Sequence, residues 1–322
     1  MATSDDTIPY DRRPEASGQL RQISPLLRRL IAPNGGPFTF TGTCSYIVGH
    51  GRVAIIDPGP DHAGHVAALL DAVAGETVAH IVVTHSHRDH SPAAVALQAA
   101  TGAPIVGCAP HTAARPLNLG ETSLLDAAND HAYAPNHILQ DGETLQGDGF
   151  SLVALATPGH TMNHLCYAFP QENALFSGDH VMAWSTSIVA PPDGSMGAYM
   201  ASLELLRGRG EAIYWPGHGG PVREPQRFVR ALIHHRRQRE ISILNRLAAG
   251  DRKIGAIVAA IYNGLDPRLR GAAGLSVFAH LEDFCARGLV ETQGPPALAG
   301  DYFCAPQQKN PIAHPPAPAI RP

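Results

Sequence analysis

One short segment of the chain carries four potential metal ligands: Thr84-His85-Ser86-His87-Arg88-Asp89-His90. It directly follows the apolar run 81–83, which is typical of a short buried strand. In an extended backbone His85 and His87 point to the same side. The turn into the next helix brings Asp89 and His90 round to a neighbouring position. Three imidazoles and one carboxylate in one small volume suit Zn²⁺, and also iron or manganese.

Three later segments place further ligands in the same context, a loop at the end of a strand. They are Thr157-Pro158-Gly159-His160, Ser177-Gly178-Asp179-His180 and Pro216-Gly217-His218-Gly219. Their glycines let the backbone turn tightly beside a ligand. With His180 left unassigned, the four segments offer five histidines and two aspartates, which are too many for one tetrahedral ion. The set suits two ions that share one carboxylate. A lone histidine after a strand is more often a surface or core residue, but four such segments in order favour a metal centre.

The rest of the chain divides into four parts by composition and periodicity. Strands and helices alternate through residues 25–225, which predicts an α/β catalytic domain, preceded by a flexible arm over 1–24. The range 226–294 begins with a long amphipathic, arginine-rich helix and continues as helix, turn, helix and short strand, the order of a winged-helix module. Residues 295–322 are rich in Pro and Ala, and we expect them to be disordered.

Composition excludes several classes of protein. The 322 residues are 44% hydrophobic, which excludes a wholly disordered chain, and the net charge of −4 excludes a uniformly basic nucleic-acid binder. Within residues 226–290, however, eleven basic and five acidic side chains give a local charge of +6. No stretch approaches the roughly 18 apolar residues of a membrane span. The N-terminus has no apolar signal-peptide core and the five cysteines are scattered, so we expect a cytoplasmic protein with reduced thiols.

The motifs THSHRDHS, TPGHTMNH, ENALFSGDH and PGHG stand in this order along the chain. The chain resembles the metallo-β-lactamase-fold hydrolases, which are αββα sandwiches with metals in a cleft at one edge of the sheets. Asp89 favours the wider hydrolase group of glyoxalase II, lactonases and nucleases, because the classical zinc β-lactamases have Cys in their second site. The chain is most similar to the lactamase-β-like subfamily, which includes a mitochondrial single-strand endoribonuclease of animals and has a C-terminal winged helix.

This resemblance implies a pair of zinc ions, with iron or manganese as alternatives, and assigns each ligand to a site. The first site would comprise His85, His87 and His160, the second Asp89, His90 and His218, with Asp179 as the bridge. Asp57, at the end of its strand, matches the buried carboxylate that orients a ligand from outside the metal site; a turn cap is the alternative for Asp57.

The resemblance also implies a mechanism in which a metal-bridging hydroxide attacks an acyl or phosphoryl centre. Asp89 would orient this nucleophile as well as bind metal. His164 would donate a hydrogen bond to a substrate oxyanion, or else support a ligand or merely occupy a strand. We expect Trp184 to line the substrate cleft, with core packing as the alternative. His131 and Tyr133 lie on the long loop 111–137 and would form part of a lid.

Three functions remain open for this sequence. The first is cleavage of single-stranded RNA, with Arg236, Arg237 and the winged helix contacting the phosphate backbone. The second is hydrolysis of a small thioester, ester, lactone or related electrophile, in which case the C-terminal module would shape the pocket or a homodimer. The third is a winged-helix regulator that senses a metal or ligand. The absence of a run of aromatic residues to stack bases weakens the first, and the complete ligand set weakens the third.

Overall fold

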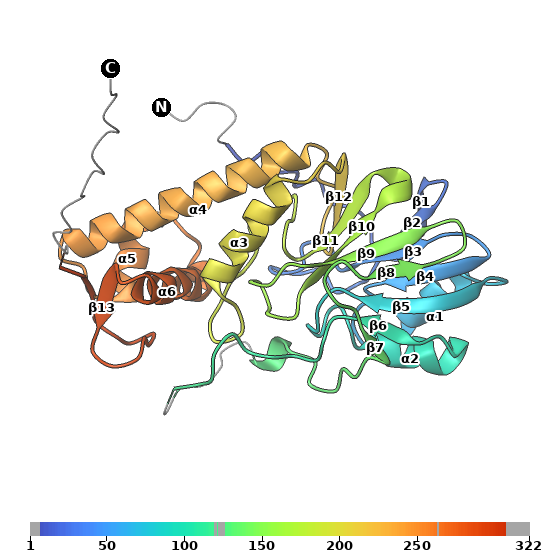
Figure 1. The fold of residues 1–322 in the computed structure, drawn as a ribbon, viewed down its shortest axis with the longest axis horizontal. Helices are drawn as coiled ribbons and strands as arrows, with labels where there is room; N and C mark the ends of the chain where they lie inside the picture. The colour runs from blue at the N-terminus through green and yellow to red at the C-terminus, as the bar shows by residue number, and fades with distance from the viewer. Residues whose placement is uncertain (1–6, 119–120, 122–125, 263, 307–322) are drawn as a thin grey trace, which may run out of the picture.

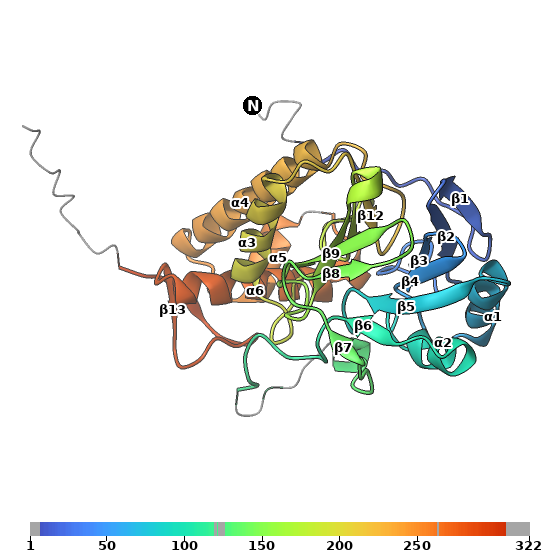
Figure 2. The same ribbon diagram turned by 45° about the vertical axis from the view of Figure 1, so that its right-hand side comes forward.

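A computed structural model describes residues 7–118, 121, 126–262 and 264–306 of the chain. Two β-sheets face each other and helices cover their outer faces, as Figure 1 shows from one side and Figure 2 from a second angle. The predicted four-layer αββα sandwich is therefore confirmed. A mainly helical module lies beside the sandwich at the C-terminal end of the described chain.

The first sheet contains the N-terminal strands. They are β1 Arg21–Ser24, β2 Leu27–Ile31, β3 Cys44–Val48, β4 Arg52–Ile56, β5 Thr77–Val83, β6 Ile105–Gly107 and β7 His137–Ile138, in this spatial order. Pairing is antiparallel from β1 to β4 and parallel from β4 to β7. Strands β4 and β5 therefore end at the same edge of the sheet, which brings the segments that follow them together.

The second sheet has five strands in the order β12-β11-β10-β9-β8. Their bounds are β8 Thr144–Gln146, β9 Ser151–Ala156, β10 Leu165–Phe169, β11 Ala174–Gly178 and β12 Ile213–Pro216. Only β11 and β12 pair in parallel, so these two strands also end at a common edge.

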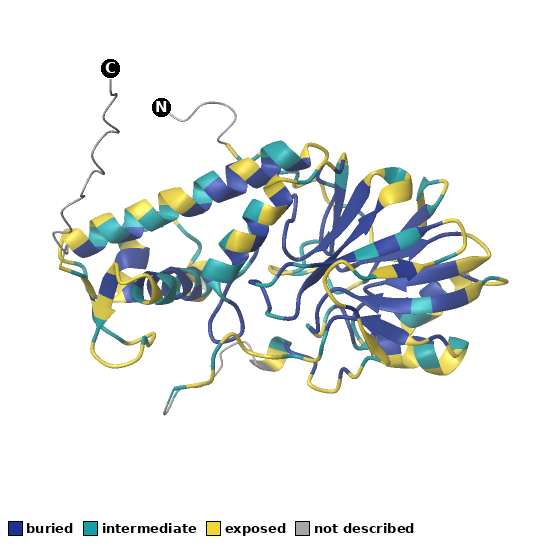
Figure 3. Cartoon of the chain, in the orientation of Figure 1, coloured by how far each residue is buried: buried dark blue, intermediate teal, exposed yellow. Residues whose placement is uncertain are grey.

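Helices cover the outer face of each sheet. The first sheet is covered by α1 Ala63–Ala72 and α2 Ala93–Thr101, and the second by α3 Met196–Arg207 and the first half of α4 Pro225–Ala248. Short 3-10 turns lie at η2 Asp126–Ala128 and η3 Pro170–Glu172. The sheet-facing sides of the helices are buried and their outer sides exposed in Figure 3, as amphipathic patterning predicts.

Aromatic side chains in the largely aliphatic core between the sheets anchor the strand ends that bear the motifs. The rings of Tyr46 and Phe176 lie 5.1 Å apart between their centroids. The buried Tyr46 hydroxyl donates to the Pro216 carbonyl at 2.7 Å, and the Tyr167 hydroxyl donates to the Val83 carbonyl at 2.7 Å. Because Val83 and Pro216 are the last residues of β5 and β12, these bonds fix where the two motif segments leave the sheets.

The C-terminal module is built on the second half of α4. It contains α5 Ile254–Ile261, η4 Pro267–Leu269, α6 Arg270–Ala286, β13 Val290–Thr292 and β14 Tyr302–Cys304. The strands β13 and β14 pair antiparallel as a small wing, and Phe278, Phe284 and Tyr302 fill a separate core beneath it. Within the described part of the chain, no helix combines the length and apolarity that crossing a membrane requires.

Two predictions about the chain ends are wrong. The described residues 7–24 do not form a loose arm, because β1 pairs with β2 and Tyr10 packs against the core under α3 and α4. The described residues 295–306 are not disordered, since β14 pairs with β13 and Tyr302 is fully buried. Both segments gain order from contacts with distant residues, which local composition does not report. The predicted disorder of residues 307–322 lies outside the described residues.

Replacing Tyr302 with Ala is expected to lower the free energy of unfolding by about 3–5 kcal/mol, the range for large buried aromatic side chains. The side chain is fully buried, and its hydroxyl donates to the Ala297 carbonyl at 2.7 Å. Urea unfolding followed by circular dichroism measures the change. Phe303→Ala is the matched control, because Phe303 is 39% exposed on the other face of the same strand. This variant should lower the free energy of unfolding by about 1 kcal/mol or less. Equal losses for the two variants would show that β14 does not close the core.

Candidate metal centre

The motif segments meet at one edge of the sandwich because the strands before them end there. Residues 84–90 follow β5, Asp179 follows β11 and His218 follows β12. The two sheets are joined at this edge by the amide of Cys44, which donates to the Gly217 carbonyl at 2.7 Å. An isolated bridge between Thr43 and His218 adds to this connection.

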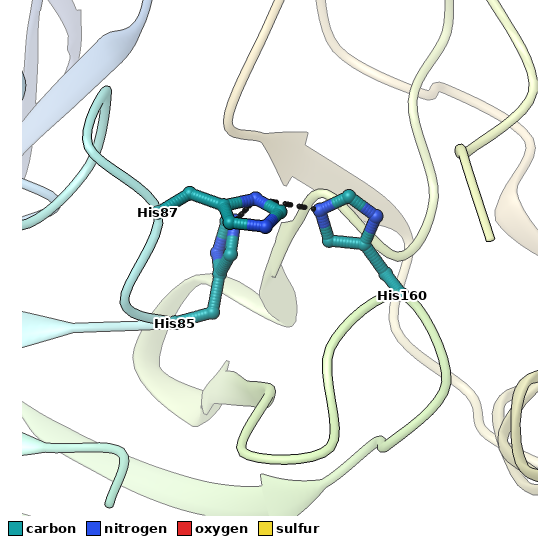
Figure 4. A group of neighbouring side chains, drawn as sticks. All are labelled: His85, His87 and His160. Carbon is teal, nitrogen blue, oxygen red and sulfur yellow. Dashed lines mark hydrogen bonds between the residues drawn. The ribbon is translucent and has the colours of Figure 1, made fainter. Parts of the chain in front are cut away.

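Three imidazoles form the first group of potential ligands, shown in Figure 4. The Nδ1 atom of His87 lies 3.0 Å from His85 Nε2 and 3.1 Å from His160 Nε2. Tetrahedral zinc with Zn–N bonds of about 2.0–2.1 Å would hold its nitrogen ligands about 3.3 Å apart. The three nitrogen atoms therefore already lie close to the separation that a common ion requires.

A second group lies beside the first and consists of Asp89, His90 and His218. The two histidine Nε2 atoms are 3.3 Å apart, and Asp89 Oδ2 is 3.1 Å from His218 Nε2. Asp179 lies between the groups, with Oδ2 3.7 Å from His160 Nε2 and 3.4 Å from His218 Nε2. The structure thus brings all seven predicted ligands together, with Asp179 in the bridging position.

Four of the ligand rings are oriented by an oxygen atom on their outer side. The Nδ1 atom of His90 lies 3.0 Å from Asp57 Oδ2. The Nδ1 atom of His160 lies 2.6 Å from the Ile188 carbonyl oxygen, and that of His218 lies 3.2 Å from the Gly42 carbonyl oxygen. The Nδ1 atom of His85 lies 3.0 Å from the Thr84 hydroxyl oxygen, and that hydroxyl donates to Asp57 Oδ2. Each oxygen accepts the ring's N–H, so the lone pair on Nε2 faces the centre of the cluster.

Asp57 lies in the orienting position that was predicted for it. Its carboxylate accepts hydrogen bonds from the Thr84 amide and the Thr84 hydroxyl, both at 2.8 Å, in addition to its contact with His90. Its φ of +48° is a left-handed conformation, which Asp and Asn adopt more readily than other non-glycine residues. The buried carboxylate therefore supports two ligands, His85 and His90.

The charge distribution fits divalent cations. Burial lowers the pKa of the His87 ring to about 3, and it lowers the pKa of His85 well below its ordinary value, so both rings are neutral. Burial also acts to lower the pKa of His218, but the carboxylates of Asp179 and Asp89 raise it to about 10. Among the described residues no hydrogen-bond donor reaches the buried Asp179 Oδ1. The neutral rings of His85 and His87 offer nitrogen lone pairs, and the carboxylates that favour a proton on His218 equally favour a metal cation in this place.

The predicted oxyanion role of His164 is wrong, because both nitrogens of its ring are engaged inside the protein. Its Nε2 accepts the Asp179 amide at 3.1 Å, and its Nδ1 lies 2.8 Å from the Thr157 hydroxyl. The side chain is 1% exposed, and the spacing of the motif alone could not show this burial. His164 instead holds the backbone of the bridging carboxylate, which is the supporting role kept as its alternative.

A cleft of about 510 Å³ lies between the sandwich and the C-terminal module; none of the seven ligands lines it, and residues 184–188 form the wall between it and the metal cluster. Trp184, which was expected to line the substrate cleft, lines this cleft and stacks on Phe40 with ring centroids 5.1 Å apart. The wall formed by residues 184–188 also contacts the metal cluster: the Ile188 carbonyl accepts His160, and the Ser187 hydroxyl donates to the Asp179 carbonyl at 2.5 Å. Sequence inspection missed Ser187 and Ile188, since the backbone carbonyl that Ile188 uses has no sequence signature.

Four further residues that were predicted to contact substrate or nucleic acid have other surroundings in the structure. Tyr133 is 5% exposed and its hydroxyl donates to the Cys108 carbonyl at 3.2 Å, so it is a core residue and not part of a lid. Arg236 is 3% exposed; it donates to the Ser187 carbonyl at 2.5 Å and lies over the Tyr199 ring, so its side chain is not free for nucleic acid. Arg237 is exposed and pairs with Glu204 at 2.8 Å. His131 is exposed beside His111, with ring centroids 5.5 Å apart, and it does not line the cleft.

Asp57→Asn is expected to lower metal affinity or activity about 10- to 100-fold, the usual effect of removing a group that orients ligands from outside the metal site. Asn keeps the shape and tolerates the positive φ, but its neutral amide cannot accept from Thr84 and His90 as the carboxylate does. Competition with a metal-chelating dye measures the affinity. Asp61→Asn, at an exposed position in the same loop, is the control. Unchanged affinity in Asp57→Asn would contradict the assigned role.

Comparison with known proteins gives a consistent result. Residues 38–218 match the sequence profile of the metallo-beta-lactamase superfamily, and residues 254–295 match that of the beta-lactamase associated winged helix domain. An atrochrysone carboxyl ACP thioesterase of Aspergillus terreus is 29% identical over 251 residues, which are 76% of this chain and 70% of the relative. A beta-lactamase-like protein 2 homolog of Caenorhabditis elegans is 28% identical over 279 residues, 84% of this chain and 88% of the relative.

A crystal structure of a metallo-beta-lactamase family protein from Thermus thermophilus superimposes with a TM-score of 0.71 at 24% identity. The match covers 88% of this chain and 100% of the Thermus thermophilus chain. At this level of identity the comparison supports the fold. The small helical module is included in that common fold, because the match extends well beyond the sandwich.

Proposed function

The chain belongs to the metallo-beta-lactamase superfamily and is a hydrolase, and we propose that it hydrolyses a thioester or ester of a small organic acid with the help of two divalent metal ions. The observation that carries this proposal is the set of overlapping ligand groups around Asp179, separated from a mostly apolar cleft by the wall 184–188. The thioesterase name of one relative supports the same class of substrate.

The seven ligands define which metals suit the centre. Imidazole and carboxylate donors in two groups of three with one shared carboxylate suit zinc, and also iron. We propose zinc as the resident metal. Two such ions supply a water molecule of lowered pKa and an electrophile that polarises the substrate carbonyl.

The protein's own residues position the reactants. Asp57 holds the ring of the ligand His90 in place through a hydrogen bond. His164 accepts a hydrogen bond from the Asp179 amide and so holds the backbone of that ligand. Asp89 is the most exposed of the carboxylates, with 26% of its side chain accessible, so it faces the side from which substrate approaches. There it orients the attacking water. Water adds to the carbonyl carbon, the carbon–sulfur or carbon–oxygen bond breaks, and the products are a carboxylic acid and a thiol or alcohol.

A small substrate is favoured over RNA by the charges along α4. Several arginines that the sequence would assign to phosphate contacts already have acidic partners: Arg227 with Glu224, Arg237 with Glu204 and Arg246 with Asp251. Arg236 is buried. A protein that holds a nucleic-acid strand needs an open basic track along its path. These pairs interrupt such a track on the outer face of α4.

The experiment that tests this function is a substrate screen with the metal-loaded protein. Thioesters of N-acetylcysteamine, p-nitrophenyl esters, lactones, bis(p-nitrophenyl)phosphate and single-stranded RNA are compared, with Asp89→Ala as the inactive control. We expect the highest kcat/KM on a thioester or ester and its loss in Asp89→Ala. Preferred cleavage of RNA would overturn the proposal in favour of a nuclease, and duplex DNA binding without turnover would indicate a regulator.

A further inference from the structure

The cleft near the metal centre is lined by aromatic side chains from both the sandwich and the C-terminal module. Phe40 and Trp184 stack at an interplanar angle of 12° on the sandwich side, and Tyr262 lines the side formed by the C-terminal module. Phe38, at the same cleft, is 55% exposed, which is unusual for so large an apolar side chain. Several aromatic side chains lining a cleft of about 510 Å³ favour a flat, apolar ligand of small-molecule size.

The charge of this cleft is opposite to that of the whole protein. Its lining includes Arg12, Arg236 and Arg239 and has no Asp or Glu, whereas the chain carries a net charge of −4. Arg236 donates a hydrogen bond to the Ser187 carbonyl, and Arg12 donates one to the Trp184 carbonyl at 3.1 Å. The cleft is therefore a basic and apolar site on an acidic protein.

Arg239 is the arginine of this group whose donors are available. Its guanidinium carbon lies 4.0 Å from the centre of the Tyr262 ring, so its face is covered and its edge remains for hydrogen bonds. It forms no ion pair with any residue that the structure describes, unlike Arg237 two positions earlier. A planar carboxylate is the group that the edge of a guanidinium binds best, through two parallel hydrogen bonds.

We propose that the acyl group of the substrate is a flat aromatic system that carries a carboxylate remote from the scissile bond, and that Arg239 binds this carboxylate. The inference rests on the proposed function, since the cleft is placed as the acyl-binding part of the hydrolase site. The ring system lies between the Phe40–Trp184 stack and Tyr262. The scissile carbonyl then reaches the metal centre past Trp184, which packs against Gly219 beside the ligand His218.

A matched pair of substrates tests this proposal: the N-acetylcysteamine thioesters of 2-naphthoic acid and of its 6-carboxylated analogue. The parent protein should prefer the carboxylated substrate. In Arg239→Gln the ratio of the two kcat/KM values should fall about 10- to 100-fold, the effect of losing charge-assisted hydrogen bonds to the carboxylate. Arg237→Gln is the matched control, because that arginine pairs with Glu204 outside the cleft, and its ratio should equal that of the parent.

Binding provides a readout that is independent of turnover. The dicarboxylate product should quench the fluorescence of Trp184, one of only two tryptophans, and the affinity should weaken about 10-fold or more in Arg239→Gln. Hydrolysis of both thioesters at equal rates, with no change of the ratio in Arg239→Gln, would overturn this inference but leave the proposed function standing. Failure to hydrolyse any thioester or ester, with RNA cleaved instead, would overturn the proposed function itself.

Discussion

Asp179→Asn is expected to reduce kcat/KM by about 10³-fold, because it removes the charge shared by the two ligand groups and thus several kcal/mol of charge stabilisation. The carboxylate oxygens lie within 3.7 Å of ligand nitrogens of both groups, at His160 and His218. The amide has the same shape, and the Asp179 backbone stays anchored to His164, so the loss reports charge and not misfolding. Steady-state kinetics and metal analysis of the same preparation measure the effect.

The control for this variant is Asp148→Asn, which makes the same change of charge at an exposed position. It should retain full activity and metal content. If Asp179→Asn kept two metal ions and more than a tenth of the parent activity, Asp179 could not be the bridge between the two groups. Circular dichroism before the assay confirms that each variant is folded.

Gly217→Ala is expected to lower activity about 100-fold, the effect of displacing reacting groups by about 1 Å. A Cβ atom at this position would lie 2.6 Å from Asp179 Oδ1 and 2.6 Å from His90 Cε1. Both distances are far below van der Waals contact, so the methyl group must push at least one ligand aside. Assays of kcat/KM and of metal stoichiometry, performed together, test this consequence.

Gly220→Ala is the matched control, three residues further along the same loop. There the nearest atom to an added Cβ is Glu15 Oε1 at 3.6 Å, which is ordinary contact. This variant should behave as the parent protein does. Full activity in Gly217→Ala would show that the ligands around it are not held in the positions described.

The metal cluster could be predicted from sequence because its residues depend on local rules. Residues 84–90 follow an apolar strand, and the glycines beside His160, Asp179 and His218 indicate strand ends. Parallel pairing of β4 with β5 and of β11 with β12 then brings the segments that follow them to common edges. The roles of single supporting residues were harder to predict, because His164 and Arg236 are defined by partners distant in sequence, at Asp179 and Ser187.

The chain ends show the same limit of sequence-based prediction, because their order also depends on contacts with residues distant in sequence. Composition indicates that residues 1–24 and 295–322 lack order, yet Tyr10 packs against one core formed by other elements and Tyr302 inserts its ring into another. A single buried aromatic side chain stabilises a segment whose average composition is polar or proline-rich. Such an anchor is visible in the sequence only as one tyrosine among polar neighbours.

The central claim is that five imidazoles and two carboxylates hold a pair of metal ions. The most direct measurement is the metal content of the purified protein by mass spectrometry, after exposure to excess Zn²⁺ and gel filtration. We expect two zinc ions per chain for the parent and for Asp148→Asn, and fewer than two for Asp179→Asn. A parent chain that retains no transition metal after this treatment would contradict the account.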